Sequence, residues 1–168
     1  MYKRQVLHDH LDGGLRVDTL LDLAKEQNYD KLPTTNKIDL LNWIEPKPNK
    51  SLAINLEAWD HTIAVMQDEN SIYRVTMEAL EDLSNDGVIY AELRFAPLVH
   101  CQNSLKPTEV VNAVLNGIKD GTDEFDILSG AILCSMRHLN NSKEVINLCI
   151  ENKDVLAFDL AGPEVGFS

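Results

Sequence analysis

VIYAELRF, from Val88 to Phe95, reads as a strand that carries two ionisable side chains in its second half. Gly87 directly precedes it, and its residues are mostly β-branched, aromatic or apolar. Side chains alternate between the two faces of a strand, so Glu92 and Arg94 share a face and are candidates for an ion pair with each other. The stretch therefore predicts a sheet strand with charged groups near its carboxyl end.

Short apolar segments alternate with amphipathic ones along the rest of the chain. Strands are predicted at Val6–His10, Val88–Phe95, Asp126–Met136 and Val155–Leu160. Helices are predicted at Thr19–Gln27, Leu52–Gln67, Ser71–Asn85, Thr108–Lys119 and Lys143–Asn152. Asp18 and Ser142 are the predicted N-caps, Gly87 follows a helix end, and Pro107 opens a first turn. LPTTNK and EPKPNK are interpreted as turns, because two prolines in the latter rule out a continuous helix.

Strand followed by helix, repeated, predicts a parallel sheet covered by helices, which is either a doubly wound sheet or a TIM (β/α)8 barrel. Every predicted strand ends in polar groups: the histidines of the first strand, Glu92 and Arg94, Arg137 and His138, and Asp159. The βα loops of a barrel enzyme have this property, whereas a doubly wound sheet concentrates its site at one switch point, and no GxGxxG or P-loop marks one here. We therefore predict an α/β protein with about the first four βα units of a TIM barrel, since a whole barrel needs about 250 residues.

The amino-acid composition argues against two classes of protein, those that bind nucleic acids and those that span a membrane. The 168 residues are 44% hydrophobic and 25% charged, with 15 basic and 27 acidic side chains and a net charge of −12. Such a surface repels phosphate backbones, which argues against nucleic-acid binding, and no segment is apolar enough to span a bilayer. The three cysteines, Cys101, Cys134 and Cys149, form no CxxC pair, which indicates a reducing, cytoplasmic setting.

LHDHLDGG, from Leu7 to Gly14, raises the question of a metal site. His8 and His10 share a face of their strand and can chelate one zinc ion, with Asp12 close by and Gly13 and Gly14 allowing a tight turn. A bare HxH is more often a chance pair, however, because a catalytic zinc needs at least three protein ligands. His61 falls in a predicted helix, His100 in a loop, and His138 beside an arginine, so spacing alone leaves the question open.

This segment, taken together with three others along the chain, indicates a protein family. The chain contains, in this order, the segments LHDHLDGGLR, VIYAELRFAP, GAILCSMRH and VLAFDLAGPE. Their order and separations resemble those of bacterial adenosine deaminases, which belong to the zinc-dependent amidohydrolase superfamily. The resemblance extends from Val6 onward. The resemblance implies a TIM barrel, in agreement with the strand ends. The H-x-E and P-C-x-x-C segments of cytidine-type deaminases are absent, which excludes that second architecture.

The resemblance also implies roles for individual residues. His8 and His10 match zinc ligands, and His10 also borders the substrate. Asp12 matches the residue that binds the ribose 5′-hydroxyl, and Gly162 matches the glycine whose amide binds the purine. Leu52, Leu56 and Trp59 match an apolar helix that forms a lid, although their spacing also suits an ordinary core-facing stripe. Gly162 by itself also suits a turn before Pro163, and Arg94 and Arg137 are interpreted as structural supports of the pocket.

The implied reaction is the hydrolytic deamination of adenosine and deoxyadenosine to inosine and ammonia by a zinc-activated water, with one Zn²⁺ per complete site and a purine nucleoside as the partner. In the family, the remaining ligands, the proton-donating glutamate and the water-orienting histidine lie on later strands. We therefore expect no catalytic residue within this chain, and expect it to be inactive alone. Two alternatives remain: a deaminase of another aminated purine nucleoside, and a short non-catalytic protein.

The domain organisation is expected to be simple. Residues 6–168 are interpreted as the amino-terminal half of a single barrel domain. Residues 1–5, MYKRQ, run into the first strand without a turn and resemble a translated transposase adapter, which makes them a candidate for a non-native leader.

Overall fold

The computed structural model describes residues 4–45, 52–163 and 166, with side chains described throughout except at 52–56. The strands are β1 (Arg4–His10), β2 (Val88–Phe95), β3 (Leu128–Met136) and β4 (Val155–Ala161). The helices are α1 (Val17–Glu26), α2 (Lys37–Ile44), α3 (Leu52–Val65), α4 (Glu69–Asn85), α5 (Pro107–Glu124) and α6 (Ser142–Glu151). Short 3₁₀ turns follow three strands: η1 (Leu11–Gly13), η2 (Pro97–His100) and η3 (Arg137–Leu139).

The four strands form one parallel sheet in which the order in space, β1-β2-β3-β4, is the order in sequence. A doubly wound sheet reverses its strand order at a switch point, whereas a barrel adds each strand beside the last. The topology is therefore that of consecutive βα units of a barrel, as the strand-end residues predict.

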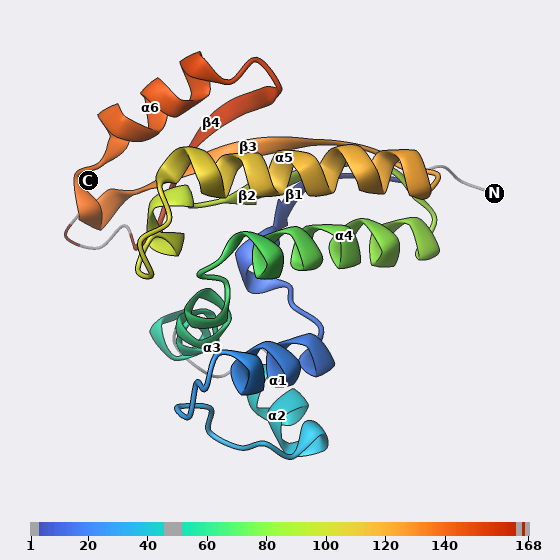
Figure 1. Cartoon of the computed structure of the whole chain (residues 1–168), viewed down its shortest axis with the longest axis vertical. Helices are drawn as coiled ribbons and strands as arrows, with labels where there is room; N and C mark the ends of the chain where they lie inside the picture. Colours follow the sequence, from blue (N-terminus) through green and yellow to red (C-terminus); the bar gives the residue numbers. More distant parts are fainter. Residues whose placement is uncertain (1–3, 46–51, 164–165, 167–168) are drawn as a thin grey trace.

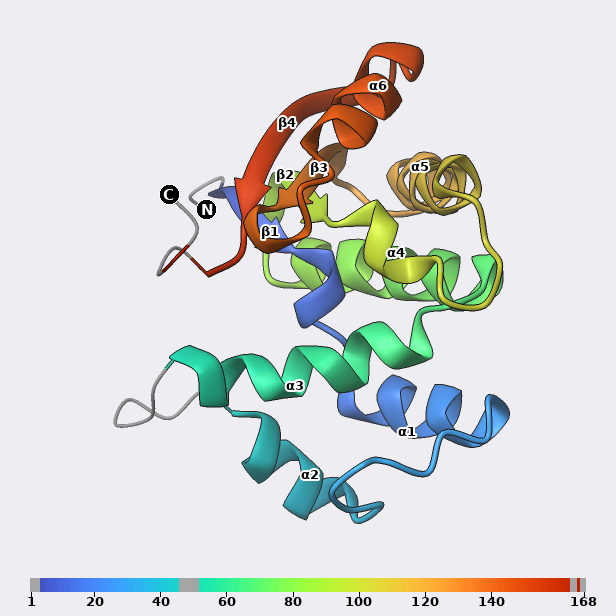
Figure 2. The same cartoon turned by 90° about the vertical axis from the view of Figure 1, so that its left-hand side faces the viewer.

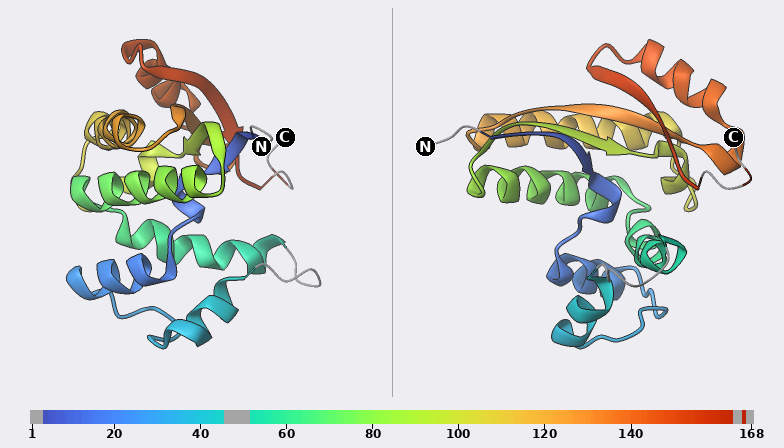
Figure 3. Two further views of the ribbon diagram at one scale, coloured as in Figure 1. Left: turned by 90° about the vertical axis from the view of Figure 1, so that its right-hand side faces the viewer. Right: turned by 180° about the vertical axis from the view of Figure 1, so that it is seen from behind.

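Among the described residues, helices cover one face of this sheet and leave the other open. Figure 1 shows α4 and α5 lying side by side along the sheet, with α6 beside β4, in agreement with the contacts of these elements. Seen from behind in Figure 3, the strands face the viewer, and no helix of the described chain covers them. Figure 2 shows α1, α2 and α3 as a separate helical layer beyond the end of β1. The core lies between the sheet and its helices, where Leu93, Phe95, Val110 and Leu133 are almost fully buried.

Several element boundaries confirm the sequence predictions. The strand β2 has the predicted bounds, and Pro107 is the first residue of α5. Gly87 follows the end of α4 with a φ of +78°, the left-handed conformation expected after a helix. No helix in the described part of the chain is long and apolar enough to cross a membrane.

Both predicted N-caps are wrong. Helix α1 begins one residue before Asp18, with Arg16 at the N-cap, because the Arg16 guanidinium is held by Glu81 and Asp82 of α4. Asp18 instead forms an ion pair with Lys37 at 2.6 Å. Ser142 is the first residue of α6 and bonds the Ser135 hydroxyl at 2.8 Å, so its side chain is not available as a cap.

Helix α2 was not predicted, because turn signals flank it on both sides. The Asn36 side chain accepts hydrogen bonds from the backbone N–H groups of Ile38 and Asp39 and thereby caps the helix. Of the predicted turn EPKPNK, only Glu45 belongs to the described residues, and it is the C-cap of α2.

The strand β1 begins at Arg4, which pairs with Val88, and it carries an irregularity that matters for the site. Its register against β2 steps from Val6–Ala91 to Asp9–Leu93, so three steps along β1 match two along β2. One extra residue is therefore accommodated around Leu7 and His8. Such bulges bend a strand locally and redirect its side chains.

Candidate functional site

The imidazole rings of His8 and His10 face each other at the carboxyl end of β1. Their Nε2 atoms are 3.0 Å apart, and their ring centroids are 5.0 Å apart. The two rings thus share a face of the strand, as the alternation of side chains predicts. His10 is half-buried and His8 is exposed.

The geometry and charge of this pair fit a zinc ion. Two nitrogens bound to one tetrahedral zinc at ~2.0–2.1 Å each lie about 3.3 Å apart, close to the observed separation. Burial lowers the pKa of His10, with a smaller contribution from His8 in the same direction, and favours the neutral imidazole that binds metals. No cluster of three histidine, cysteine, aspartate or glutamate side chains suited to a metal occurs within the described residues, so the pair would supply only part of the ligand set of such a site.

Trp59 of α3 packs over this end of β1. Its indole centroid is 5.0 Å from that of His10. A Cβ atom at Gly13 would stand 2.6 Å from Trp59 Nε1, so only glycine permits the close approach of the ring. The other two predicted lid residues, Leu52 and Leu56, belong to the backbone of α3, but their side chains lie outside the described residues.

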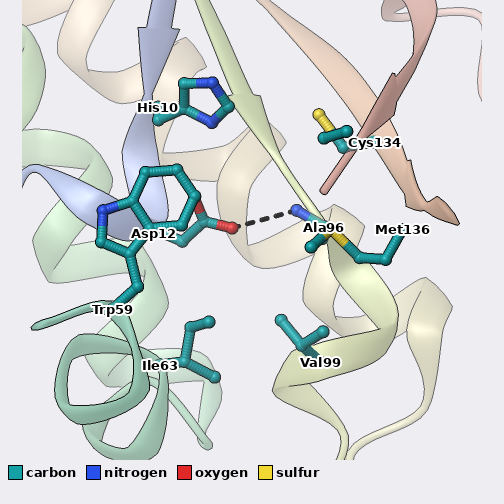
Figure 4. A pocket seen from close by; sticks show the side chains of 9 residues that line it. His10, Asp12, Trp59, Ile63, Ala96, Val99, Cys134 and Met136 are labelled. Carbon is teal, nitrogen blue, oxygen red and sulfur yellow. Dashed lines mark hydrogen bonds between the residues drawn. The ribbon is translucent and has the colours of Figure 1, made fainter. Parts of the chain in front are cut away.

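Asp12 lies in η1 and is buried, with an exposed fraction of 3%. Its Oδ2 accepts a hydrogen bond from the Ala96 N–H at 3.1 Å, shown as the dashed line in Figure 4. Its carbonyl accepts the Thr62 hydroxyl of α3 at 2.6 Å. Asp12 Oδ1 is buried and has no hydrogen-bond partner within the described residues, which leaves an acceptor available in the site.

His100, at the end of η2, is a site residue that the sequence prediction did not include. Its Nε2 is 3.7 Å from Asp12 Oδ2, and its Nδ1 bonds the Met66 carbonyl at 3.0 Å. The ring is almost fully buried. Asp12 and His100 are 88 positions apart, which hides this contact from any sequence pattern; the one signal is the place of His100 just after a strand.

A groove of about 630 Å³ runs along the carboxyl ends of the strands. It brings together residues of β1, α3, η3 and β4 that are distant in sequence, among them His8, His10, Trp59, His138, Asp159 and Gly162. A small cavity of about 20 Å³ lies deeper, between His10, Asp12 and Trp59 on one side and Cys134 and Met136 of β3 on the other (Figure 4). That volume suffices for one water-sized group.

Gly162 lies at the rim of this groove, directly after β4. Its φ of +98° belongs to the left-handed region, which other residues rarely adopt. A Cβ atom there would also stand 3.4 Å from His138 Nδ1 and from the Met136 side chain. A Cβ atom would fit at these distances, so it is the backbone conformation that favours glycine at the edge of the groove.

The expected pairing of Glu92 with Arg94 is wrong. Arg94 Nη1 donates to Asp159 Oδ2 of β4 at 2.7 Å, and Arg94 Nη2 donates to the Leu7 carbonyl of β1 at 2.9 Å. Glu92 accepts instead from the Tyr90 hydroxyl at 3.1 Å. Although burial raises the pKa of Asp159, the Leu160 N–H and the Arg94 guanidinium lower it on balance, so this carboxylate is held in its charged form.

The sequence from residue 4 to 168 matches the family model described as adenosine deaminase. The chain belongs to the adenosine deaminase family. Adenosine deaminases of Mycobacterium avium (strain 104) and Mycobacterium leprae (strain TN) are each 42% identical to it over 171 residues. Those residues cover 97% of the chain and 47% of each relative. The chain thus spans about half the length of the curated adenosine deaminases that it matches.

Solved structures confirm the fold class. An adenine deaminase from Arthrobacter aurescens superposes with a TM-score of 0.84 at 25% identity, over 97% of this chain and 50% of its own. The arabidopsis ADAL complexed with GMP gives a TM-score of 0.79 at 25% identity, with the same coverage. A Burkholderia ambifaria amidohydrolase with bound Zn gives 0.82 at 19% identity, over 98% of this chain and 45% of its own, which supports the fold alone. The described residues therefore form four parallel strands of the adenosine deaminase barrel together with the helices that connect them.

Proposed function

We propose that this chain contributes one half of the active site of a zinc-dependent deaminase that converts adenosine and deoxyadenosine to inosine and ammonia. The observation that carries the proposal is the His8–His10 pair, with Nε2 atoms 3.0 Å apart, at the head of a groove that also contains Trp59 and Gly162. Membership in the adenosine deaminase family supports the reaction.

The chain's own residues would hold and orient the substrate. His8 and His10 would bind Zn²⁺, which when bound lowers the pKa of water toward ~7. Asp12, held by Ala96 and Thr62 with Oδ1 unpartnered, would accept a hydrogen bond from the ribose 5′-hydroxyl. The backbone amide of Gly162 would bind the purine. Trp59, together with Leu52 and Leu56 on the same helix, would keep water out of the groove.

The charges of the groove favour a nucleoside over a nucleotide. Asp60 and Asp159 line it, and no lysine or arginine does so among the described residues. A 5′-phosphate next to Asp12 would add like charge without a cation to offset it. The arabidopsis structures with IMP and GMP belong to proteins about 25% identical to this chain, so AMP is the competing substrate to test.

The experiment compares the chain alone with a fusion in which residues 1–168 are continued by the other half of the M. avium adenosine deaminase. With zinc added, we expect the fusion to deaminate adenosine, followed by loss of adenosine absorbance and by ammonia release, and we expect the chain alone to be inactive. The fusion carrying His8→Ala and His10→Ala should lose both zinc and activity. Native-like turnover by the chain alone would overturn the half-site, and a preference for AMP or adenine would reassign the substrate.

A further inference from the structure

The buried side chain of Arg94 connects three strands of the sheet. Its two terminal nitrogens reach Asp159 on β4 and the Leu7 carbonyl on β1, while Arg94 itself lies on β2. The residue is buried, with an exposed fraction of 8%. Asp159 is fixed in turn, since its Oδ1 accepts the Leu160 N–H at 2.8 Å. We call this set of contacts the Arg94 brace.

The brace contacts β1 at its irregular point. Leu7 lies in the segment where the register steps from Val6–Ala91 to Asp9–Leu93, and it directly precedes His8. His10 is the register partner of Arg94 itself. The guanidinium therefore fixes the backbone immediately before one histidine and lies opposite the other.

We propose that Arg94 is a positioning residue for the histidine pair: by binding the Leu7 carbonyl and Asp159 together, it holds the irregularity of β1 in the form that places both His8 and His10 on the face of the sheet where Arg94 and Asp159 lie. The inference rests on the proposed metal-binding role of the pair, but the geometry that it explains is visible without metal. If β1 continued regularly from the Val6–Ala91 pair, His8 would lie beside Leu93 and His10 beside Phe95, on the face that packs against the helices.

Arginine suits this task because its planar fork can hold two partners in fixed directions. Lysine carries the same charge on a single nitrogen, which has three donors but no rigid fork to hold the two partners in separate fixed directions. Arg94→Met keeps length and apolar packing and removes both hydrogen bonds. Asp159→Asn keeps the shape of the carboxylate but removes the charge that orients the fork.

Two measurements on the chain as it stands test the proposal. The first is the nuclear Overhauser effect between the ring protons of His10 and those of Trp59, whose ring centroids are 5.0 Å apart, recorded without metal. The second is the affinity for Zn²⁺ alone, from histidine chemical shifts during a titration. In Arg94→Met we expect the cross-ring effect to disappear and zinc affinity to fall about 10- to 100-fold, the range typical of lost partners around metal ligands. Arg94→Lys and Asp159→Asn should give intermediate losses.

Arg74→Met is the matched control. Arg74 also contacts two carboxylates, Glu78 at 2.8 Å and Asp22 at 3.0 Å, but it joins α4 to α1 and does not touch β1. It should leave both readouts unchanged. If folded Arg94→Met keeps the cross-ring effect and the zinc affinity of the wild type, the proposal is wrong. If Arg94→Met does not fold, unchanged readouts in Asp159→Asn overturn it equally.

The two readouts separate this inference from the proposed function. A wild-type chain that binds no zinc but shows the cross-ring effect, with its loss in Arg94→Met, supports the brace and counts against the metal site. Zinc affinity that is equal in the wild type and in Arg94→Met supports the metal site and counts against the brace.

Discussion

The indole of Trp59 occupies the space that any side chain at Gly13 would need, with Trp59 Nε1 2.6 Å from where a Cβ atom would stand. The contact joins η1, which carries Asp12, to α3, the helix expected to cover the substrate. The position of that helix thus depends on the absence of a side chain at one residue.

Gly13→Ala should destabilise the protein by about 1–3 kcal/mol, since overpacking forces either the indole or the backbone to move. Gly14→Ala is the matched control, because a Cβ atom there would meet only the His10 carbonyl at 3.4 Å, and its φ of −107° suits alanine. Urea unfolding followed by tryptophan fluorescence measures both. Equal stability of the two variants would show that Trp59 can move away without cost.

Asp159 predicts a pH dependence of stability. Its pKa is lowered in the folded protein, so its ion pair with Arg94 contributes stability above the unfolded-state pKa of about 3.9. That contribution is lost as the pH falls through the lowered folded-state pKa. The difference in unfolding free energy between the wild type and Asp159→Asn should therefore be constant near neutral pH and shrink below about pH 4. A difference that does not change with pH down to 2 would contradict the charged pair.

The three cysteines should differ in reactivity. Burial, followed by the charge of Asp159, raises the pKa of Cys134 to about 12, whereas Cys101 and Cys149 are only partly buried. At pH 8 the thiolate fraction of Cys134 would be about one in ten thousand, and the thiolate is the reactive form. Iodoacetamide should modify Cys101 and Cys149 well before Cys134 in the native protein, and all three at similar rates in urea. Mass spectrometry of tryptic peptides gives the order, and early modification of Cys134 would show that β3 opens to solvent.

The strands were predictable from the sequence because their apolar runs are bounded by turns, and β2 has the predicted limits. Helix α2 was missed because its short amphipathic segment lies between LPTTNK and EPKPNK, two stretches rich in turn residues. The N-caps at Asp18 and Ser142 were wrong because tertiary partners, Lys37 and Ser135, hold these side chains. Local propensity does not include such partners.

The same limit applies to the site. The alternation of strand residues predicted that His8 and His10 share a face, and the structure confirms it. The roles of Asp12, Gly162 and Trp59 came from the family resemblance and stay predictions. Two contacts depend on how the strands lie beside one another: that of His100 with Asp12, and the pairing of Arg94 with Asp159 instead of Glu92. No spacing rule along the chain contains that information.

The Arg94 brace also implies an order of events during synthesis of the protein. Translation produces the segment with His8 and His10 first, but its anchor, Asp159, leaves the ribosome about 150 residues later. Until the fourth strand docks, the Arg94 guanidinium can reach the Leu7 carbonyl but lacks the carboxylate that orients it, so the brace is incomplete in the early chain. If the proposed roles of the brace and the histidine pair hold, a nascent polypeptide would acquire a metal late, after translation has passed β4, although His8 and His10 are made at its very beginning.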